Sequence, residues 1–307
     1  MKTYIITGAT SGLGLSIAKS LAKDKENQVV FAVRDVVRGK ILADTCGVNC
    51  SVMPLDLCSM RSVDDFIASW RGSIAGLINN AGVQIVGDTR FTDDELEETF
   101  VVNHLAALKL TQGLLPYMHL GRVLFIGSGT HNPKSITARL FGFRGARFES
   151  IEQCAKGSGN GGSKGDSSRR LGMDRYATSK FLNMVTTIEF SRRVSGTKVS
   201  FFCLDPGLMA GTGLARSAPL LVQFLWVNIL PWLAKALPDT STAERSGHAA
   251  AWIMTSAELE EKTGVVFSYD CKPAKNVWSR VYGAELGQSV MDDSMNLLST
   301  DSVTLVV

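Results

Sequence analysis

A glycine-rich turn close to the first residue constrains the fold more than any other feature of this chain. Residues 4–6 are apolar and predict a short buried strand, and Gly8, Gly12 and Gly14 follow in a T-G-x-x-x-G-x-G spacing before a helical pattern at 13–24. Glycines permit a tight turn in which unpaired N–H groups and the positive end of the helix dipole face a phosphate. The turn therefore predicts a dinucleotide-binding loop at the start of a βαβ unit. The residues assigned to it are Gly8, Thr10, Ser11, Gly12, Leu13 and Gly14.

Apolar runs of strand length alternate with helical patterns along most of the chain, which is typical of repeated βαβ units in a parallel sheet. The predicted strands are residues 4–6, 28–33, 51–54, 76–79, 122–126, 198–204 and 265–269. The predicted helices are residues 13–24, 36–46, 59–70, 93–118, 174–194 and 241–255. We therefore expect an α/β fold of the Rossmann type, with a doubly wound, mostly parallel sheet of about seven strands and helices on both faces.

Composition and charge exclude several classes of function. Of the 307 residues, 45% are hydrophobic and 20% charged, which supplies enough apolar surface for a core. A net charge of +3 is too balanced for binding nucleic acid. The six cysteines and four histidines show no ligand spacing, so we expect no metal site, and scattered free thiols fit a reducing compartment. The first strand leaves no room for a signal peptide, so we expect a cytoplasmic protein, or one of the plastid stroma if a transit peptide has been removed.

One segment interrupts the alternation without forming a second domain. Residues 130–175 carry nine basic and four acidic residues around a glycine-rich centre at 157–165. This composition predicts a flexible basic insertion before the helix predicted at 174–194. We expect a single domain over 1–283 and a C-terminal tail at 284–307. The end of that tail, residues 302–307, either pairs as an edge strand or contacts a second subunit of a homo-oligomer.

A second interruption is apolar. Residues 217–234 contain no charge over eighteen positions, which approaches the length of a membrane-spanning helix. Pro219 and Pro231 interrupt the segment, and in lipid they would leave backbone groups unsatisfied. We therefore expect helices within 214–238 that cover an apolar substrate pocket, with shallow peripheral membrane contact kept as an alternative.

Two arginines follow the second predicted strand, where a Rossmann fold meets the adenosine ribose. Arg34 lies at the turn and Arg38 one helical turn later, so both can offer forked donors to a 2′-phosphate, which favours NADP(H). Asp35 keeps NAD(H) open, since a carboxylate aimed at the ribose would favour it. Asp56, after the third strand, is placed to accept from the adenine amino group, or else serves as a helix N-cap. Leu57 is assigned to the same part of the cofactor site.

Two further motifs complete a recognisable pattern. An N-N-A-G segment at 79–82 follows the fourth strand, and Tyr176 and Lys180 form a Y-x-x-x-K pattern after a strand that ends before Ser128. With these motifs the chain resembles the short-chain dehydrogenase/reductase family over nearly its whole length. The resemblance implies that four consecutive residues lie beside the cofactor, namely Asn79, Asn80, Ala81 and Gly82.

The spacing of Tyr176 and Lys180 has a chemical reason. Residues four apart share one helix face, so the ammonium can lie close to the phenol. A nearby cation favours the phenolate, so we expect the pKa of Tyr176 to fall below its ordinary value of about 10 and its hydroxyl to donate a proton during reduction. The resemblance implies that Lys180 also binds the nicotinamide ribose and that Ser128 hydrogen-bonds the reacting substrate oxygen. Asn103 would support a water that links Lys180 to solvent, or else is a hydrogen-bonded asparagine inside a helix.

The turn after the sixth predicted strand also resembles a family segment. Residues 205–213 look like the family's P-G segment, which faces the nicotinamide. The resemblance implies that backbone groups at Pro206 and Gly207 and the hydroxyl of Thr212 fix the carboxamide. As bare sequence the segment is only a glycine-rich turn.

The interval between Ser128 and Tyr176 indicates a branch of the family. It spans 48 positions, far more than in many relatives, which places the insertion over the mouth of the site. The insertion and the tyrosine helix together resemble the light-dependent protochlorophyllide oxidoreductase branch, which reduces a ring C=C of a magnesium tetrapyrrole with NADPH, with retinol dehydrogenases as neighbours. Two positions depart from that branch. It carries a cysteine where this chain has Leu208, and it tends to N-N-A-A where Gly82 stands here.

We therefore predict an NADPH-dependent oxidoreductase that transfers hydride to a carbonyl or conjugated C=C of a bulky hydrophobic substrate, with Tyr176 as proton donor. The apolar segment and the basic insertion would cover the pocket, and basic side chains of the insertion would meet substrate carboxylates. Two alternatives stay open. The first is a light-dependent protochlorophyllide reductase acting on a tetrapyrrole, and the second is a catalytically weak NADP(H)-binding scaffold.

Overall fold

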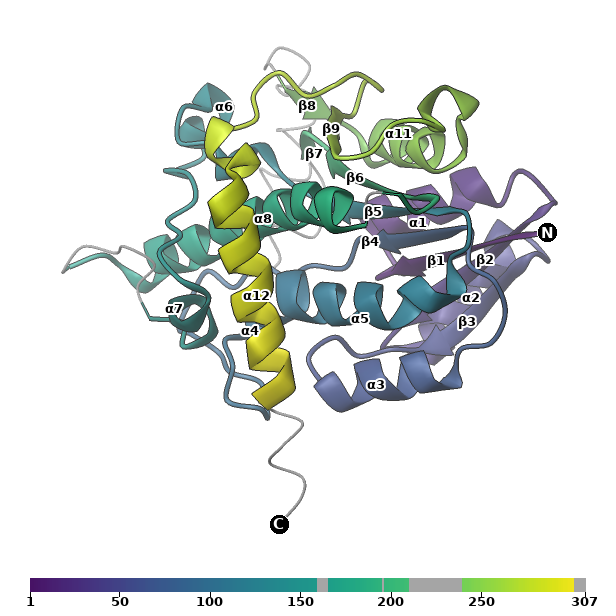
Figure 1. Ribbon diagram of the computed structural model, residues 1–307, viewed down its shortest axis with the longest axis horizontal. Coiled ribbons are helices and arrows are strands. Elements are labelled where there is room, and N and C mark those ends of the chain that lie inside the picture. The colour runs from purple at the N-terminus through teal and green to yellow at the C-terminus, as the bar shows by residue number, and fades with distance from the viewer. Residues whose placement is uncertain (159–164, 195, 210–238, 301–307) are drawn as a thin grey trace.

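The computed structural model describes residues 1–158, 165–194, 196–209 and 239–300. Seven strands form one sheet in the order β3-β2-β1-β4-β5-β6-β9, and all six pairings are parallel (Figure 1). The strands are β1 (Lys2–Thr7), β2 (Asn27–Val33), β3 (Cys50–Pro54), β4 (Gly76–Asn79), β5 (Gly121–Ile126), β6 (Val199–Asp205) and β9 (Val265–Ser268). The predicted Rossmann-type sheet is confirmed, because each expected strand is present within three residues of its predicted bounds.

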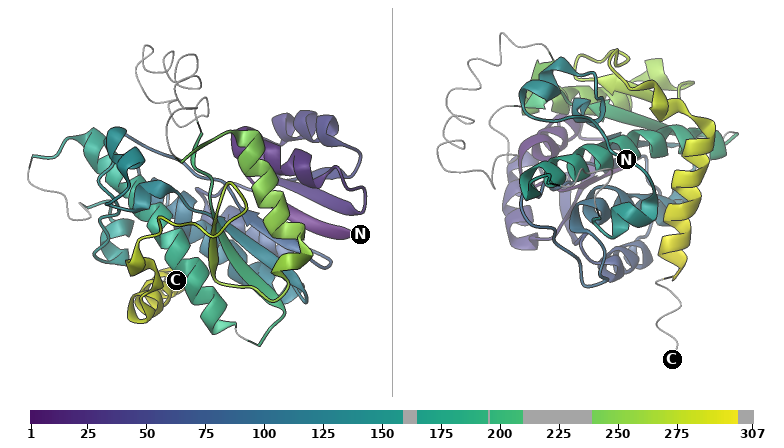
Figure 2. Two further views of the ribbon diagram at one scale, coloured as in Figure 1. Left: turned by 90° about the horizontal axis from the view of Figure 1, so that it is seen from above. Right: turned by 90° about the vertical axis from the view of Figure 1, so that its left-hand side faces the viewer.

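Helices cover both faces of the sheet, as a doubly wound fold requires (Figure 2). One face carries α1 (Gly12–Leu21), α2 (Val36–Cys46) and α11 (Ala243–Thr255). The other carries α3 (Met60–Ser69), α5 (Ala106–Leu114), α8 (Ser168–Arg193) and α12 (Ala284–Thr300). Each face buries a core of its own, with Ile17 and Phe31 in the first and Phe125 and Phe181 in the second.

The parallel pairing gathers the loops that carry the predicted motifs. Because the strands run in one direction, their carboxyl ends share one edge of the sheet, which is where open α/β sheets bind ligands. The glycine loop follows β1, the N-N-A-G segment follows β4 and Ser128 follows β5. These three loops come from neighbouring strands, since β1, β4 and β5 are adjacent in the sheet.

The helix expected at 93–118 is interrupted and begins later than predicted. It starts with α4 (Glu98–Phe100), passes through a π-helical turn (Val101–Leu105) into α5, and ends in a 3-10 turn (Leu115–Tyr117). The early start is wrong because the backbone of Glu95 takes a left-handed φ of 59°. Glu97 then caps the helix by accepting the Phe100 N–H over 2.7 Å.

The described parts of the predicted insertion contain regular structure. A 3-10 turn (Gly129–His131), α6 (Ile136–Leu140) and α7 (Ile151–Ala155) follow β5. Helix α8 starts at Ser168, six residues before the predicted start, because Ser167 accepts the Arg170 N–H at its N-terminus. Residues 159–164, at the glycine-rich centre, lie outside the described residues.

Residues 284–300 are not a tail, which corrects the sequence-based expectation. They form α12, which packs across α8 (Figure 1). Arg193 of α8 binds Asp292 over 2.7 Å, and His104 of the π turn bonds the buried Ser294 over 3.1 Å. The predicted edge strand or subunit contact at 302–307 lies outside the described residues.

The apolar segment at 214–238 also lies outside the described residues. On either side of it, β7 (Leu208–Met209) and β8 (Thr240–Ser241) pair in parallel. No helix in the described part of the chain has both the length and the apolar character needed to cross a membrane.

Candidate active site

The glycine loop has a backbone that other residues could not form without strain or collision. Gly12, which begins α1, takes a left-handed φ of 51°, and a Cβ there would meet nothing within 4 Å. Gly14 is enclosed, since a Cβ there would lie 2.4 Å from Asn80 Nδ2 and 2.5 Å from the Gly8 carbonyl oxygen. The loop therefore presents open backbone at Gly12 and packs tightly against the N-N-A-G segment at Gly14.

The amino-terminal end of α1 has no capping side chain. Ser11 holds the N-cap position with an extended backbone and makes no side-chain hydrogen bond to the first turn. Helices α2, α3, α8 and α11 are each capped by their own side chain, from Asp35, Ser59, Ser167 and Thr242 respectively. The first N–H groups of α1 thus stay available as donors, and the helix dipole favours an anion at this end. These features fit a dinucleotide diphosphate.

The N-N-A-G segment is fastened to the end of β1. Thr7 Oγ1 accepts the backbone N–H groups of Asn80 and Ala81 over 3.0 and 2.9 Å. Asn80 Nδ2 donates back to the Thr7 carbonyl over 2.8 Å, and Asn79 Nδ2 donates to Thr111 Oγ1 over 2.9 Å. The structure therefore brings this segment together with the glycine loop, as the family pattern implies.

At the predicted adenosine end, the acidic residues have local partners. Asp35 Oδ1 accepts the Arg38 N–H over 2.9 Å and so caps its own helix, α2. The side chains of Arg34 and Arg38 are exposed. Asp56 Oδ1 accepts the Cys58 N–H over 3.0 Å, whereas Ser59 caps α3, so the alternative that Asp56 is a helix N-cap is wrong.

Tyr176 and Lys180 lie buried on one face of α8, 8% and 4% exposed. Lys180 Nζ donates to the Ile126 carbonyl at the end of β5 over 3.1 Å, and lies 5.7 Å from the centre of the Tyr176 ring. Asn183 Nδ2 donates to the same carbonyl over 3.1 Å. The ammonium therefore lies over the Tyr176 ring, and the end of β5 fixes the position of the lysine.

The pKa of Tyr176 is raised, whereas the sequence predicted a lowered value. Burial raises it most, the nearby Asp205 carboxylate raises it further, and a hydrogen bond with the Ser128 side chain acts in the opposite direction. Burial also lowers the pKa of Lys180 to about 8. Desolvation therefore sets the direction of both shifts. The consequence is a phenol that holds its proton at neutral pH.

The Ser128 carbonyl is bonded by a histidine to which the sequence analysis assigned no role in the site. His131 is fully buried, its Nδ1 lies 2.6 Å from the Ser128 carbonyl oxygen, and its Nε2 accepts the Trp278 N–H over 3.1 Å. Since Nε2 accepts, Nδ1 carries the proton of the neutral ring and donates it to Ser128. Burial lowers the pKa of His131 to about 4. No sequence signal pointed to its partner, which is 147 positions away.

Asp205 is a second residue that sequence reasoning missed. It ends β6, its Oδ1 accepts the Gly207 N–H over 3.1 Å, and burial raises its pKa to about 6. It also accepts from the backbone of Gly129, next to Ser128. A carboxylate immediately before Pro206-Gly207 was a usable signal, because the end of a parallel strand points at the ligand edge.

Asn103 is a hydrogen-bonded helical asparagine, as one alternative held, but in a π-helical turn. Its Oδ1 accepts the Val83 N–H over 2.7 Å, and its Nδ2 donates to the Val83 carbonyl and to Ser179 Oγ, both over 2.9 Å. A Cβ on Gly82 would lie 3.2 Å from Asn103 Oδ1 and 3.3 Å from Lys180 Nζ. Gly82, Asn103 and Lys180 thus meet at one point.

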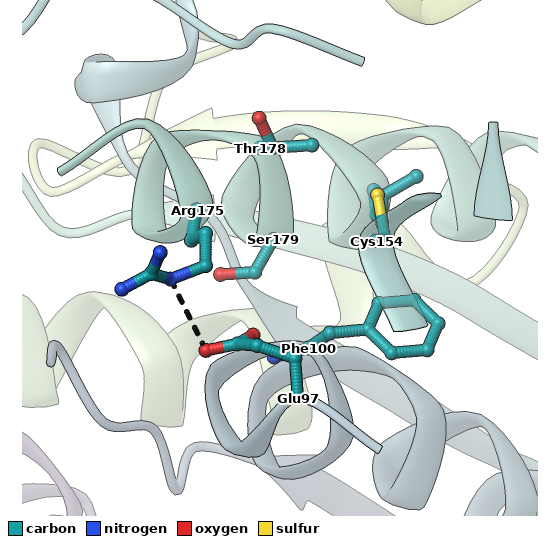
Figure 3. Close-up of a pocket in the computed structure, with 7 residues that line it drawn as sticks. Glu97, Phe100, Cys154, Arg175, Thr178 and Ser179 are labelled. Carbon is teal, nitrogen blue, oxygen red and sulfur yellow. Dashed lines mark hydrogen bonds and ion pairs between the residues drawn. The ribbon is translucent and has the colours of Figure 1, made fainter. Parts of the chain in front are cut away.

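A buried ion pair joins α8 to the chain before α4. Arg175, next to Tyr176, places its Nε 3.3 Å from Glu97 Oε1, and both side chains are at most 5% exposed (Figure 3). Arg175 Nη1 also donates to Thr89 Oγ1 over 3.1 Å. Arg144 likewise pairs with an acid of the chain, because its Nε donates to Asp174 Oδ1 over 3.0 Å. The expectation that basic side chains of the insertion bind substrate carboxylates is therefore wrong for Arg144 and Arg175, which neutralise the chain's own acids.

The P-G turn is described only as far as residue 209. Gly207 has a left-handed φ of 69°, Ser246 Oγ donates to the Pro206 carbonyl over 2.7 Å, and Leu208 N–H donates to the Asp239 carbonyl over 2.8 Å. These bonds place the turn beside Asp205 at the carboxyl edge. The predicted cofactor contact of Thr212 lies outside the described residues.

Comparison with known proteins shows the family to which this chain belongs. The short chain dehydrogenase family model matches residues 2–139. Chloroplastic protochlorophyllide reductase of Pisum sativum is 32% identical over 289 residues, which cover 87% of this chain and 69% of the relative. The chain belongs to the short-chain dehydrogenase family. A second relative of this short-chain dehydrogenase, chloroplastic protochlorophyllide reductase of Chlamydomonas reinhardtii, is 29% identical, covering 95% of this chain and 74% of that protein.

A solved structure supports the fold of this short-chain dehydrogenase. L-sorbose reductase from Gluconobacter frateurii, complexed with NADPH and L-sorbose, superimposes with a TM-score of 0.66 at 19% identity, over 90% of this chain and 97% of that one. Membership of the family makes the chain an oxidoreductase that works with a nicotinamide cofactor. The uncapped end of α1 and the open backbone at Gly12 fit that group.

Proposed function

We propose that this short-chain dehydrogenase reduces a carbonyl or conjugated C=C of a bulky hydrophobic substrate with NADPH, and that Tyr176 donates the proton. One observation carries the proposal. Tyr176, Lys180 and Ser128 meet at the carboxyl edge of the sheet, where the backbone of the uncapped glycine loop also lies. A proton donor, a cation and a hydroxyl beside a dinucleotide cradle are what a hydride-transfer reductase needs.

The residues divide the work as follows. The bound nicotinamide would supply the hydride. A tyrosine holds its proton at neutral pH even at its ordinary pKa of about 10, and burial and Asp205 raise the pKa of Tyr176 further. The phenol is therefore protonated and can donate to the substrate oxygen or carbon. Ser128 hydrogen-bonds the reacting oxygen and holds it near the phenol. Lys180, anchored on the Ile126 carbonyl, stabilises the phenolate that remains after transfer.

The choice of NADPH is supported at the other end of the cradle. Arg34 and Arg38 expose their guanidinium groups just after β2, and the carboxylate of Asp35 is taken up by its own helix. The two arginines are therefore available to a 2′-phosphate without a competing acid aimed at the ribose. L-sorbose reductase, which shares the fold, was solved with NADPH bound.

The test is NADPH oxidation by the purified protein in darkness with a panel of hydrophobic aldehydes, ketones and enones. We expect turnover of at least one member, and its loss in Tyr176→Phe. Turnover with NADH but not NADPH would overturn the cofactor assignment. NADPH bound tightly, with no turnover in darkness or light, would instead support a catalytically weak scaffold.

A second candidate is light-dependent reduction of protochlorophyllide. It is favoured by the relatives, which are named protochlorophyllide reductases and are 29–32% identical to this chain. Leu208 and Gly82 depart from the pattern of that branch, which is why we rank it second. Bleaching of bound protochlorophyllide only under illumination, with NADPH consumed, would support it. A plastid location belongs to this candidate.

A further inference from the structure

We propose that Phe143 determines specificity by forming an apolar wall beside the Tyr176 ring, and that this wall selects substrates whose carbonyl is conjugated to a flat ring. The inference rests on the proposed function and names its substrate class more closely. The ring centres of Phe143 and Tyr176 are 6.1 Å apart and inclined by 47°. Phe143 is half-buried, so it covers part of Tyr176 and still presents surface of its own.

The position of the Phe143 ring is fixed by its own backbone. Gly142 and Gly145, on either side of the Phe143-Arg144 pair, take left-handed φ values of 87° and 91°. A Cβ on Gly145 would lie 2.6 Å from Pro133 Cα, so the turn is closely packed. The Phe143 N–H donates to the Ala138 carbonyl over 3.0 Å, which attaches the turn to α6.

The side chain of Arg144 ties the same turn to the catalytic helix. Its Nε donates to both carboxylate oxygens of Asp174 over 3.0 Å, and its Nη2 lies 2.6 Å from Asp166 Oδ2. Asp174 lies on α8 two residues before Tyr176, so these bonds attach the turn to the helix that carries the predicted proton donor. A few residues on, the Arg147 N–H donates to Thr178 Oγ1 over 2.9 Å. The ring is therefore preorganised before any substrate arrives.

The charges around Phe143 decide what kind of substrate the wall suits. Arg144 is neutralised by two carboxylates, so this side of Tyr176 presents an aromatic face rather than a free cation. The centres of the Phe143 and Tyr176 rings are 6.1 Å apart, so Phe143 would lie next to the substituents of a substrate whose oxygen is bonded to the Tyr176 hydroxyl. A flat ring joined directly to the carbonyl can pack on that face, and aromatic pairs gain stability beyond area burial. A puckered saturated ring cannot stack in the same way.

The experiment compares two ketones of nearly equal size, acetophenone and cyclohexyl methyl ketone. Their dissociation constants from the full-length protein saturated with NADP⁺ are measured by equilibrium dialysis. Wild type, Phe143→Leu and Phe143→Tyr are compared. We expect wild type to prefer acetophenone, Phe143→Leu to lose about two- to tenfold of that preference, and Phe143→Tyr to restore it. Unchanged NADPH affinity serves as the control for an intact fold.

The possible outcomes distinguish a failure of the Phe143 proposal from a failure of the proposed reductase function. Equal weakening of both ketones in Phe143→Leu, with their ratio unchanged, would overturn the inference and leave Phe143 a structural residue. Binding of neither ketone to wild type would also overturn it. Preferential binding without turnover of either ketone in darkness would instead contradict the proposed function and leave the wall standing. Where turnover occurs, the same ratio is expected in KM, with kcat changed less than twofold.

Discussion

At the scale of single residues, the site is governed by desolvation. Lys180 was expected to lower the pKa of Tyr176, yet the phenol is 8% exposed and its pKa rises. The spacing of the two residues was visible in the sequence, but the depth of the pair depends on elements that pack over α8 and could not be predicted from spacing. The placement of Tyr176 and Lys180 on one helix face was therefore predictable, whereas the direction of the Tyr176 pKa shift was not.

Replacing Tyr176 by Phe removes the transferable proton and keeps the ring. We expect kcat for a reduced carbonyl to fall by about 10² to 10⁴, the usual contribution of a general acid, while the dissociation constant for NADPH changes less than about twofold. Stopped-flow NADPH oxidation and a fluorescence titration measure the two quantities. An undiminished rate in the variant would remove Tyr176 from the role of proton donor.

Replacing Arg34 by Ala tests the 2′-phosphate contact. Loss of one charge-assisted hydrogen bond at an exposed site should weaken NADPH by roughly tenfold and leave NADH unchanged. Lys40→Ala is the matched control, since Lys40 is exposed on the helix that follows Arg34 and is not part of the predicted site. Equal weakening of both dinucleotides would show that Arg34 does not read the 2′ position.

At the scale of elements, the strands were predictable and the helix boundaries less so. Buried parallel strands are short continuous apolar runs, so β2 and β5 could be located to within a residue of each end. The start of α4 depends on Glu97, whose pairing with Arg175 spans 78 positions and leaves no local trace. The π turn at Val101–Leu105 likewise has no pattern distinguishable from an α-helix.

Gly12 and Gly14 are expected to respond differently to alanine. Gly12→Ala introduces strain of about 1 kcal/mol at a left-handed backbone and places a methyl group in the open space of the loop, so NADPH affinity should fall at least tenfold with little loss of stability. Gly14→Ala collides with Asn80 and the Gly8 carbonyl and should lower the free energy of unfolding by roughly 1–3 kcal/mol. Urea unfolding and NADPH titration measure both effects.

The control for Gly12 is Gly72→Ala. Gly72 also has a left-handed φ, 95°, and a Cβ there would likewise meet nothing within 4 Å, but it lies outside the predicted cofactor site. It should reproduce the small loss of stability and leave NADPH binding unchanged. A similar loss of NADPH affinity in both variants would argue against diphosphate binding at Gly12.

At the scale of the whole molecule, the domain is stabilised by a hydrophobic core on each face of the sheet and by the packing of α12. The apolar positions Leu286, Val290 and Leu298 have a helical period, so α12 was readable from the sequence in principle. Its partners were not, because Ser294 meets His104 across 190 positions. The expectation of a C-terminal tail from residue 284 is wrong because these apolar side chains are buried against the rest of the domain.

Global stability should fall in mild acid. The pKa of the buried His131 is lowered from 6.5 to about 4, so between these pH values the unfolded chain binds the proton that the native state excludes. The free energy of unfolding therefore decreases as the pH falls from 6.5 to 4, by roughly 3 kcal/mol for this group. His104, with a pKa of about 3, acts in the same direction, and Asp205, with a raised pKa of about 6, opposes both.

Urea unfolding at several pH values compares wild type with His131→Gln. We expect a shallower decrease in the variant between pH 6.5 and 4, with the contribution of His104 retained. Parallel curves for the two proteins would show that His131 is not the group responsible. The variant should also be less stable near pH 7, because the Ser128 and Trp278 partners lose their bonds.

The order of the strands places the predicted nucleotide-binding residues and the predicted proton donor in different parts of the chain. Strand β1 lies between β2 and β4, and β3 adds to β2, so one half of the sheet draws every partner from residues up to Asn79. A ribosome has therefore delivered the glycine loop, Arg34 and Asp56 long before it reaches Tyr176. A messenger RNA that ends between codons 83 and 175 would therefore encode these predicted cofactor residues without the predicted proton donor.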